Sequence, residues 1–111
     1  MRGEPEPMSS PLVSIILVNY NGADVIEDCL RSLQLHLQTI PYETIVVDND
    51  SGDGSPELIQ QKFPAVKLIR LAENRGFGAG NNAGARIAKG EFLLLLNTDT
   101  LLTEDILPAL V

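Results

Sequence analysis

The chain has 111 residues, of which 44% are hydrophobic and 21% are charged, and this composition predicts one globular domain with a modest core. Its formal net charge of -7 makes the phosphate backbone of a nucleic acid an unfavourable partner, so we expect no nucleic-acid binding. The single cysteine, Cys29, excludes a disulfide within the chain, and no apolar run approaches the roughly 18 residues of a membrane span. We therefore expect a cytoplasmic protein with a buried, inert thiol. For the full-length protein, a peripheral position at the inner face of the membrane stays open.

Residues 1–11 contain three prolines and two glutamates and are predicted to form a flexible tail, which leaves residues 12–111 as the folded domain. Four apolar runs in that domain have the length and composition of buried parallel strands: residues 13–18, 44–47, 66–71 and 92–96. Helical patterns follow them at residues 25–37, 55–63, 79–88 and from 103 onwards. Ser55 is predicted to cap the second helix, with Pro56 at its first position, and Thr103 is predicted to open the fourth.

This alternation predicts the fold class, which is α/β, with a Rossmann-like open parallel sheet and helices on both faces. Each connection is long enough for a right-handed crossover between parallel strands. The sequence stops one or two turns into the last predicted helix, so we expect the natural protein to continue beyond Val111.

Polar residues follow every predicted strand, and parallel strands bring them to the edge of the sheet where open α/β folds bind ligands. Asp48 directly follows the second strand and is predicted to accept a hydrogen bond from a nucleotide base or a ribose. An Asx-turn leading into Ser51 is the structural alternative. Arg75, in the third loop, is a candidate donor to a diphosphate, with a surface ion pair to Glu73 as the alternative.

The fourth strand ends in Asn97, Thr98 and Asp99, so a carboxylate lies just beyond a rigid element. Because this edge is acidic and a phosphorylated ligand is anionic, Asp99 predicts a bridging divalent cation, Mg²⁺ or Mn²⁺. A helix N-cap is the alternative reading of the same residues. Gly76 and two nearby glycines are predicted to permit close packing or the close approach of a ligand. They match the dinucleotide fingerprint only weakly, because they do not follow the first strand.

In this order and spacing, residues 13–21, 46–55, 74–84 and 94–100 resemble the family-2 inverting glycosyltransferases, whose nucleotide-sugar domain has the GT-A fold. The resemblance extends from residue 12 to about residue 107. The variants Asp48-Asn49-Asp50-Ser51 and Asn74-Arg75-Gly76-Phe77 are similar to the rhamnosyltransferase-type branch. The chain would then be the N-terminal half of a GT-A domain, which is the half that binds the donor.

The resemblance implies that Asp48 contacts the base, that Tyr20 and Asn21 line the base pocket, and that Asn82 and Gly84 lie near the ribose and phosphates. Asp99 matches the last acid of the family's D-x-D metal motif, while its first acid is replaced here by asparagine. The nucleotide-sugar-binding residues implied are Val18, Tyr20, Asn21, Asp48, Asp50, Arg75, Gly76, Asn82, Gly84, Asn97 and Thr98, with Asp99 as the metal ligand. The family's catalytic base lies beyond the D-x-D motif, so no catalytic residue is assigned.

The expected function is transfer of a sugar, with inversion, from a UDP- or dTDP-sugar to a hydroxyl of an acceptor glycan or lipid-linked sugar, in the synthesis of a cell-surface polysaccharide. We expect the chain to be inactive alone. Because the fourth strand leaves apolar surface uncovered, we also expect a homodimer, a swapped assembly or poor solubility. Two alternatives stay open. One is a Rossmann-type NAD(P)-binding oxidoreductase fragment, and the other is a receiver-like signalling domain with Asp48 as its phosphoacceptor.

Overall fold

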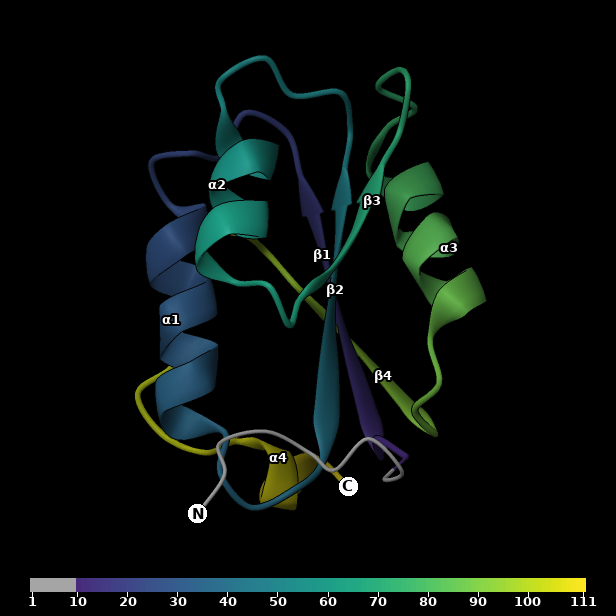
Figure 1. Ribbon diagram of the computed structural model, residues 1–111. Helices are drawn as coiled ribbons and strands as arrows, with labels where there is room; N and C mark the ends of the chain where they lie inside the picture. The colour runs from purple at the N-terminus through teal and green to yellow at the C-terminus, as the bar shows by residue number, and fades with distance from the viewer. Residues whose placement is uncertain (1–9) are drawn as a thin grey trace.

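The computed structural model describes residues 10–111, so nearly all of the predicted tail lies outside the described residues. Strands and helices alternate as predicted, in the order β1 (Val13–Asn19), α1 (Ile26–His36), β2 (Tyr42–Asp48), α2 (Ser55–Lys62), β3 (Lys67–Arg70), α3 (Phe77–Ile87), β4 (Phe92–Leu96) and α4 (Leu107–Leu110). The strands form one parallel sheet in the order β3-β2-β1-β4, with helices on both sides (Figure 1). The predicted fold class is confirmed.

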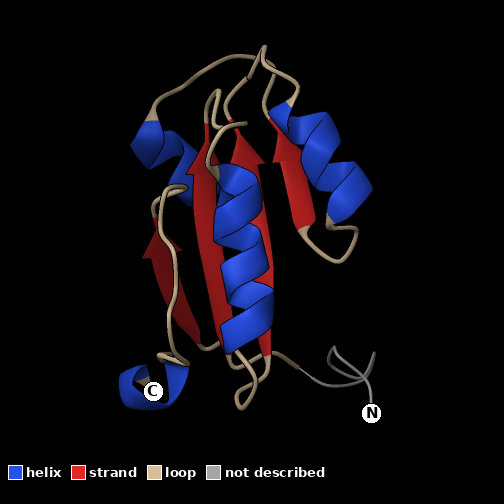
Figure 2. Cartoon of the chain, turned by 90° about the vertical axis from the view of Figure 1, so that its left-hand side faces the viewer, coloured by secondary structure: helices blue, strands red, loops and turns tan. Residues whose placement is uncertain are grey.

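The register of the sheet brings the carboxyl ends of the strands together. Asn19 of β1 lies beside Asp48 of β2, and Leu17 of β1 lies beside Leu96 of β4. Figure 2 shows the strands pointing the same way, with the loops after β1, β2 and β3 gathered beyond the arrowheads. The chain runs from β1 outwards to β3 and then returns to β4 on the other side of β1. Such a switch in strand order beside β1 is where open α/β sheets bind ligands.

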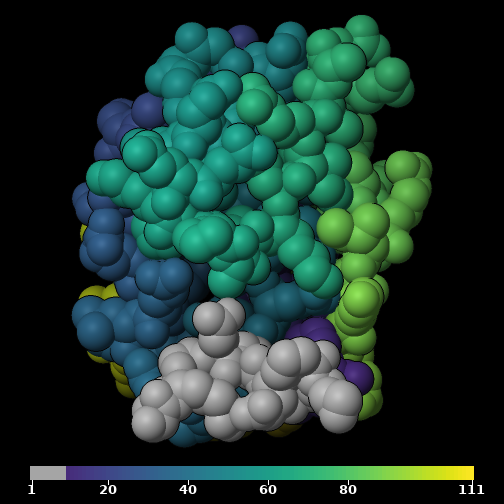
Figure 3. All heavy atoms as spheres, viewed as in Figure 1, coloured from purple at the N-terminus to yellow at the C-terminus, as the bar shows by residue number. Residues whose placement is uncertain are grey.

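The two faces of the sheet are covered by different helices. On one face α1 and α2 pack over a core that includes Ile15, Leu17 and Val46. On the other face α3 packs over Ile16 and a smaller cluster. In the space-filling view, α2 and β3, in teal, occupy the middle of the visible face (Figure 3). Because β1 and the carboxyl half of β2 are covered on both faces, residues 15–18 and 45–47 are continuously apolar.

Helix α3 lies close to the sheet because two of its glycines, Gly80 and Gly84, face the strands. A Cβ built on Gly84 would lie 2.7 Å from Cγ2 of Ile16, and one built on Gly80 would lie 2.7 Å from Cγ1 of Val18. A larger residue at either position would push the helix off the strands or force a side chain out of place.

Strand β4 is the least covered strand of the sheet. Its residues Phe92, Leu93 and Leu95 are 45%, 51% and 51% exposed, because α3 packs over β1 and β2 and does not extend across β4. Within residues 10–111, β4 pairs only with β1, so its outer edge is free. Among the described residues, no helix is long and apolar enough to cross a membrane.

Several predicted boundaries were wrong, and the fourth helix most of all. It begins at Leu107 and not at Thr103, because the Asp105 carboxylate accepts hydrogen bonds from the N–H groups of Gln38 and Thr39 and from the Thr39 hydroxyl at 2.8 Å. These bonds hold the segment before α4 against the loop after α1. The predicted cap of the second helix is also one residue late: Gly54, with φ +85°, precedes the helix, and Ser55 is its first residue.

Candidate functional site

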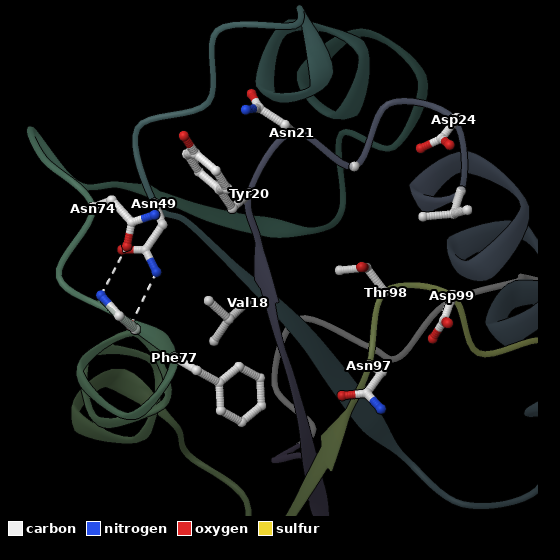
Figure 4. A pocket seen from close by; sticks show the side chains of 13 residues that line it. Val18, Tyr20, Asn21, Asp24, Asn49, Asn74, Phe77, Asn97, Thr98 and Asp99 are labelled. Atoms are coloured by element: carbon white, nitrogen blue, oxygen red, sulfur yellow. Dashed lines mark hydrogen bonds between the residues drawn. The ribbon is translucent and has the colours of Figure 1, made fainter.

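A pocket of about 650 Å³ opens at the carboxyl edge of the sheet, between the loops that follow all four strands (Figure 4). The residues that line it come from β1 and its loop into α1, from the ends of β2 and β4, and from the start of α3. They are Val18, Tyr20, Asn21, Gly22, Asp24, Val25, Asn49, Asn74, Gly76, Phe77, Asn97, Thr98 and Asp99. Of the predicted site residues, Val18, Tyr20, Asn21, Gly76, Asn97, Thr98 and Asp99 are thus brought together.

The end of β4 supplies the polar side of the pocket. Asn97 and Asp99 are exposed there, and Asp24 lies across from them in the loop before α1 (Figure 4). Two hydrogen bonds hold the main chain at Asn97. Its carbonyl oxygen accepts from the N–H of Thr100 at 3.1 Å and from the thiol of Cys29 at 3.9 Å. The lining residues include two acids and no lysine or arginine, so this side of the pocket is negative.

Cys29 confirms the prediction of a buried thiol. Its side chain is fully buried in α1. Burial and the negative charge of Asp99 raise the pKa of the Cys29 thiol to about 11. A thiol with such a pKa is almost entirely protonated near neutral pH, so Cys29 does not act as a nucleophile. Its role is to donate a hydrogen bond to the end of β4.

The loop after β1 is fastened to the loop after β2. Asn21, with φ +52°, accepts a hydrogen bond on its side-chain oxygen from the N–H of Gly52 at 2.8 Å. Its own N–H donates to the hydroxyl of Ser51 at 2.8 Å. The Asn21 side chain is therefore used within the protein, whereas the ring of Tyr20 is 55% exposed beside the pocket.

Asp48 does not line the pocket, contrary to the expectation from its place after β2. Its side chain is 1% exposed. One oxygen accepts from Nδ2 of Asn19 at 2.8 Å and from the Ser51 hydroxyl at 2.7 Å, and the other accepts from the Ser51 N–H at 2.9 Å. This is the Asx-turn that was the structural alternative. The carboxylate is fully engaged inside the protein, so this geometry gives no support to a direct contact with a base.

Four further predicted site residues also lie outside the pocket lining: Asp50, Arg75, Asn82 and Gly84. The Arg75 guanidinium forms an exposed ion pair with Glu73 at 3.2 Å, which was the alternative for it. Such surface pairs are weak and exchange partners easily. Gly84 is buried against Ile16, so its role here is close packing. Asp50 and Asn82 are exposed near this edge of the fold, and their contact with a nucleotide stays a prediction.

The pocket also contains residues that the sequence analysis did not select, notably Asp24, Asn49, Asn74 and Phe77. Asn49 is 2% exposed, and its side chain reaches the loop before α3. Phe77 is the first residue of α3 and is 56% exposed. The sequence feature that could have identified Phe77 is its place between two glycines, because a large apolar residue in such a loop has no core to bury it.

The donor atoms at the end of β4 fit a divalent cation that binds together with a phosphate. No cluster of three or more His, Cys, Asp or Glu residues that could hold a metal occurs in residues 10–111. Asp99 and Asn97 nevertheless both line the pocket, where they offer a carboxylate and an amide oxygen. Mg²⁺ is commonly held by one or two carboxylates, with substrate phosphates and water completing its shell. Such a donor set favours a cation brought in by the nucleotide over a preformed metal centre.

Residues 14–111 match the family described as Glycosyl transferase family 2. The succinoglycan biosynthesis protein ExoO of Rhizobium meliloti is 35% identical over 96 residues, which are 86% of this chain and 27% of that protein. The poly(ribitol-phosphate) beta-glucosyltransferase of Bacillus spizizenii is 39% identical over 94 residues, 78% of this chain and 14% of that protein.

Solved structures give the same result. The mannosyltransferase PcManGT from Pyrobaculum calidifontis, in complex with GDP-Man and Mn²⁺, superposes with a TM-score of 0.79 and 30% identity over 95% of this chain and 32% of its own. TarS of S. aureus in complex with UDP-GlcNAc gives 0.78 and 27% over 88% of this chain and 29% of its own. The chain thus spans less than a third of each of these relatives. The match over nearly all of its own length shows that the chain belongs to glycosyl transferase family 2.

Proposed function

We propose that this chain is the donor-binding part of a glycosyltransferase and that its pocket holds a nucleoside diphosphate sugar. The observation that carries the proposal is the pocket at the switch point of the sheet, with Asp99 on one side and exposed aromatic rings on the other. Its volume of about 650 Å³ lies in the range of small-molecule sites. The relatives solved with GDP-Man and Mn²⁺ and with UDP-GlcNAc support this ligand class.

The lining residues suggest how the ligand lies. Tyr20 offers an exposed ring to the base, and the amides of Asn49 and Asn74 stand near it. At the other side Asp99 and Asn97 would hold a divalent cation at the diphosphate. When bound, this cation would neutralise the charge that develops on the departing nucleoside diphosphate.

The finer parts of the proposal concern the reaction. We assign inversion, a UDP- or dTDP-sugar donor, a rhamnosyltransferase-like specificity and an acceptor glycan or lipid-linked sugar as hypotheses, motivated by the sequence motifs. No residue of the chain is assigned as the catalytic base, because Asp48 and Asp53 already accept hydrogen bonds from protein groups. Family membership argues against the NAD(P)-binding and receiver alternatives, and Asp48 is too buried to be a phosphoacceptor.

Calorimetric titration with UDP, dTDP and GDP, each with and without Mn²⁺, tests the proposal. We expect binding that strengthens with Mn²⁺, and we expect Asp99→Asn to weaken the Mn²⁺-dependent part by about tenfold, the effect of losing one charged interaction. Glu104→Gln is the matched control, because it removes the same charge from an exposed position outside the pocket. Equal affinity with and without Mn²⁺, or tighter binding of NADH than of any nucleoside diphosphate, would contradict the proposal.

A second measurement concerns transfer. Incubated with a labelled UDP-sugar and candidate acceptors, the purified 111-residue chain is expected to bind the donor without producing a glycosylated product. A product formed above the rate of donor hydrolysis would require a base within residues 1–111, and the exposed acids Asp24 and Asp50 would be the first to substitute.

A further inference from the structure

We infer that Asn49 is a positioning residue that holds Phe77 in the wall of the pocket, and that the Phe77 ring contacts the nucleoside part of the ligand. This inference rests on the proposed function for the identity of the ligand, but the contact between Asn49 and the loop before α3 does not. The two residues lie on different elements, one at the end of β2 and the other at the start of α3.

The Asn49 amide binds the loop in two directions. Its Nδ2 donates to the carbonyl oxygen of Gly76 at 3.0 Å, and its Oδ1 accepts from the N–H of Arg75 at 3.2 Å. Figure 4 shows the bond from Asn49 to Gly76 as a dashed line. Within residues 10–111, the other hydrogen bond between residues 74–76 and another element is the helical bond from the Gly80 N–H to the Gly76 carbonyl oxygen at 3.1 Å. Asn49 therefore supplies the side-chain hydrogen bonds that tie this loop to the sheet.

Asn49 is suited to this task because it is itself immobile. Its side chain is 2% exposed, and its main-chain N–H donates to the carbonyl of Asn19 at 2.8 Å, which ties it to the end of β1. An amide carries both a donor and an acceptor, whereas a carboxylate can only accept. Replacement by Asp would therefore lose the bond to Gly76 and place a negative charge against its carbonyl oxygen.

The loop determines where Phe77 goes. Gly76 has φ +92° and ψ 170°, a conformation that glycine tolerates and that turns the chain directly into α3. The Gly76 N–H is also bound locally by Oδ1 of Asn74 at 2.8 Å. Because Phe77 is the next residue, the position of the Gly76 peptide sets the direction of the ring.

Phe77 has no structural use that explains its position. It is 56% exposed, and it belongs to neither of the two apolar cores. In the close-up, the ring lies on the same side of the β1 end as Val18, away from the acids Asp24 and Asp99 (Figure 4). An apolar ring remote from the acids suits the base or ribose of the ligand better than its diphosphate.

The chain contains no tryptophan, so Phe77→Trp gives a single fluorescent reporter at the proposed contact. Without ligand, we expect Asn49→Asp in this background to lower the anisotropy of the Trp and to raise its acrylamide quenching constant about twofold, because the loop loses one of its two tethers. Gln60→Glu, an exposed amide-to-carboxylate change on α2, is the matched control and should change neither. If circular dichroism shows that Asn49→Asp fails to fold, Asn49→Ser removes both tethers without adding a charge.

Ligand binding then tests the contact. We expect Phe77→Ala to weaken UMP without metal and UDP with Mn²⁺ by the same factor, about tenfold, because both ligands share the nucleoside. Asp99→Asn should weaken only UDP with Mn²⁺. Unchanged Trp anisotropy in Asn49→Asp would overturn the positioning role, and unchanged UMP affinity in Phe77→Ala would overturn the contact. If the parent chain binds no nucleotide, the proposed function and the contact both fall, while the ligand-free anisotropy still decides whether Asn49 positions the loop.

Discussion

Asp48 and Asp50 allow the role of the β2 end to be tested with one chemical change at two positions. Asp48→Asn keeps the size of a side chain that is 1% exposed and accepts three hydrogen bonds. The new amide keeps one acceptor oxygen and replaces the other with an NH₂ group. Depending on its orientation, this NH₂ group faces either the Ser51 N–H, or Nδ2 of Asn19 and the Ser51 hydroxyl. Losing a charged hydrogen bond costs about 1.5–3 kcal/mol, and a buried donor left unpaired costs a similar amount. We expect the free energy of unfolding to fall by about 3 kcal/mol, which lowers the Tm by roughly 12–24 °C in a domain of this size.

Asp50→Asn is the control, because Asp50 is exposed, with φ +63°, a conformation that asparagine also adopts. Its free energy of unfolding should change by less than about 0.5 kcal/mol. Thermal and urea unfolding followed by circular dichroism measure the difference, and calorimetry with UDP and Mn²⁺ measures binding at a temperature where both variants are folded. If Asp48→Asn unfolds like Asp50→Asn and yet loses nucleotide affinity, Asp48 touches the ligand and the reasoning from its hydrogen bonds is refuted.

Three further outcomes are expected. Gly84→Ala should destabilise the fold by about 1–3 kcal/mol, because its Cβ would lie 2.7 Å from Ile16. Gly78→Ala has no atom within 4 Å of its Cβ and should stabilise α3 by about 0.5–1 kcal/mol. Equal effects of the two variants in urea unfolding would contradict the close approach of α3 to the sheet. The pKa of Cys29, raised from 9.0 to about 11, favours the protonated thiol in the folded state, so stability should be fully present below about pH 9 and decline as the pH rises to 11. Iodoacetamide at pH 8 should modify Cys29 about 100-fold more slowly in the folded chain than in urea, and equal rates would show that the thiol is accessible. The free edge and exposed leucines of β4 predict a homodimer by light scattering that Leu95→Lys weakens, while a monomer at every concentration would disprove this.

The sequence was sufficient to predict the order of the elements, because β1 and β2 carry apolar runs that only a doubly covered strand explains. The predicted start of the fourth helix was wrong because of a long-range contact, which no local sequence pattern reveals. Thr103-Glu104-Asp105 has the composition of a helix start, but the Asp105 carboxylate binds the loop at Gln38 and Thr39, more than 60 residues away in the chain. Although burial raises it, these hydrogen bonds, with one from the Leu107 N–H, hold the pKa of Asp105 below its usual value.

The pocket was predicted more completely on its β1 and β4 sides than at the β2 end. Asp99 follows β4 in a loop that opens towards solvent, so its residue type and position indicated a ligand site, and the family resemblance added Tyr20 after β1. At the β2 end, whether Asp48 faces the pocket depends on a residue of the neighbouring strand. Asp48 lies beside Asn19 in the sheet register, and the buried amide of Asn19 captures its carboxylate. The next residue, Asn49, then points to the loop before α3.

The polar residues at the carboxyl edge thus form two layers with different roles, one that joins elements of the fold and one that faces the pocket. The inner layer consists of buried residues: Asn19 donates to Asp48 and to the Ser55 hydroxyl, each at 2.8 Å. The Ser55 hydroxyl in turn donates at 2.6 Å to the exposed Asp53. The inner layer joins the ends of β1 and β2 to the start of α2. The outer layer, which includes Tyr20 and Asp99, faces the pocket and depends on the inner layer for its position. Asn49 belongs to both, since it is buried like the first and lines the pocket like the second. A substitution in the inner layer should therefore appear first as lost stability, one in the outer layer as lost affinity, and one at Asn49 as a displaced loop in a chain that still folds.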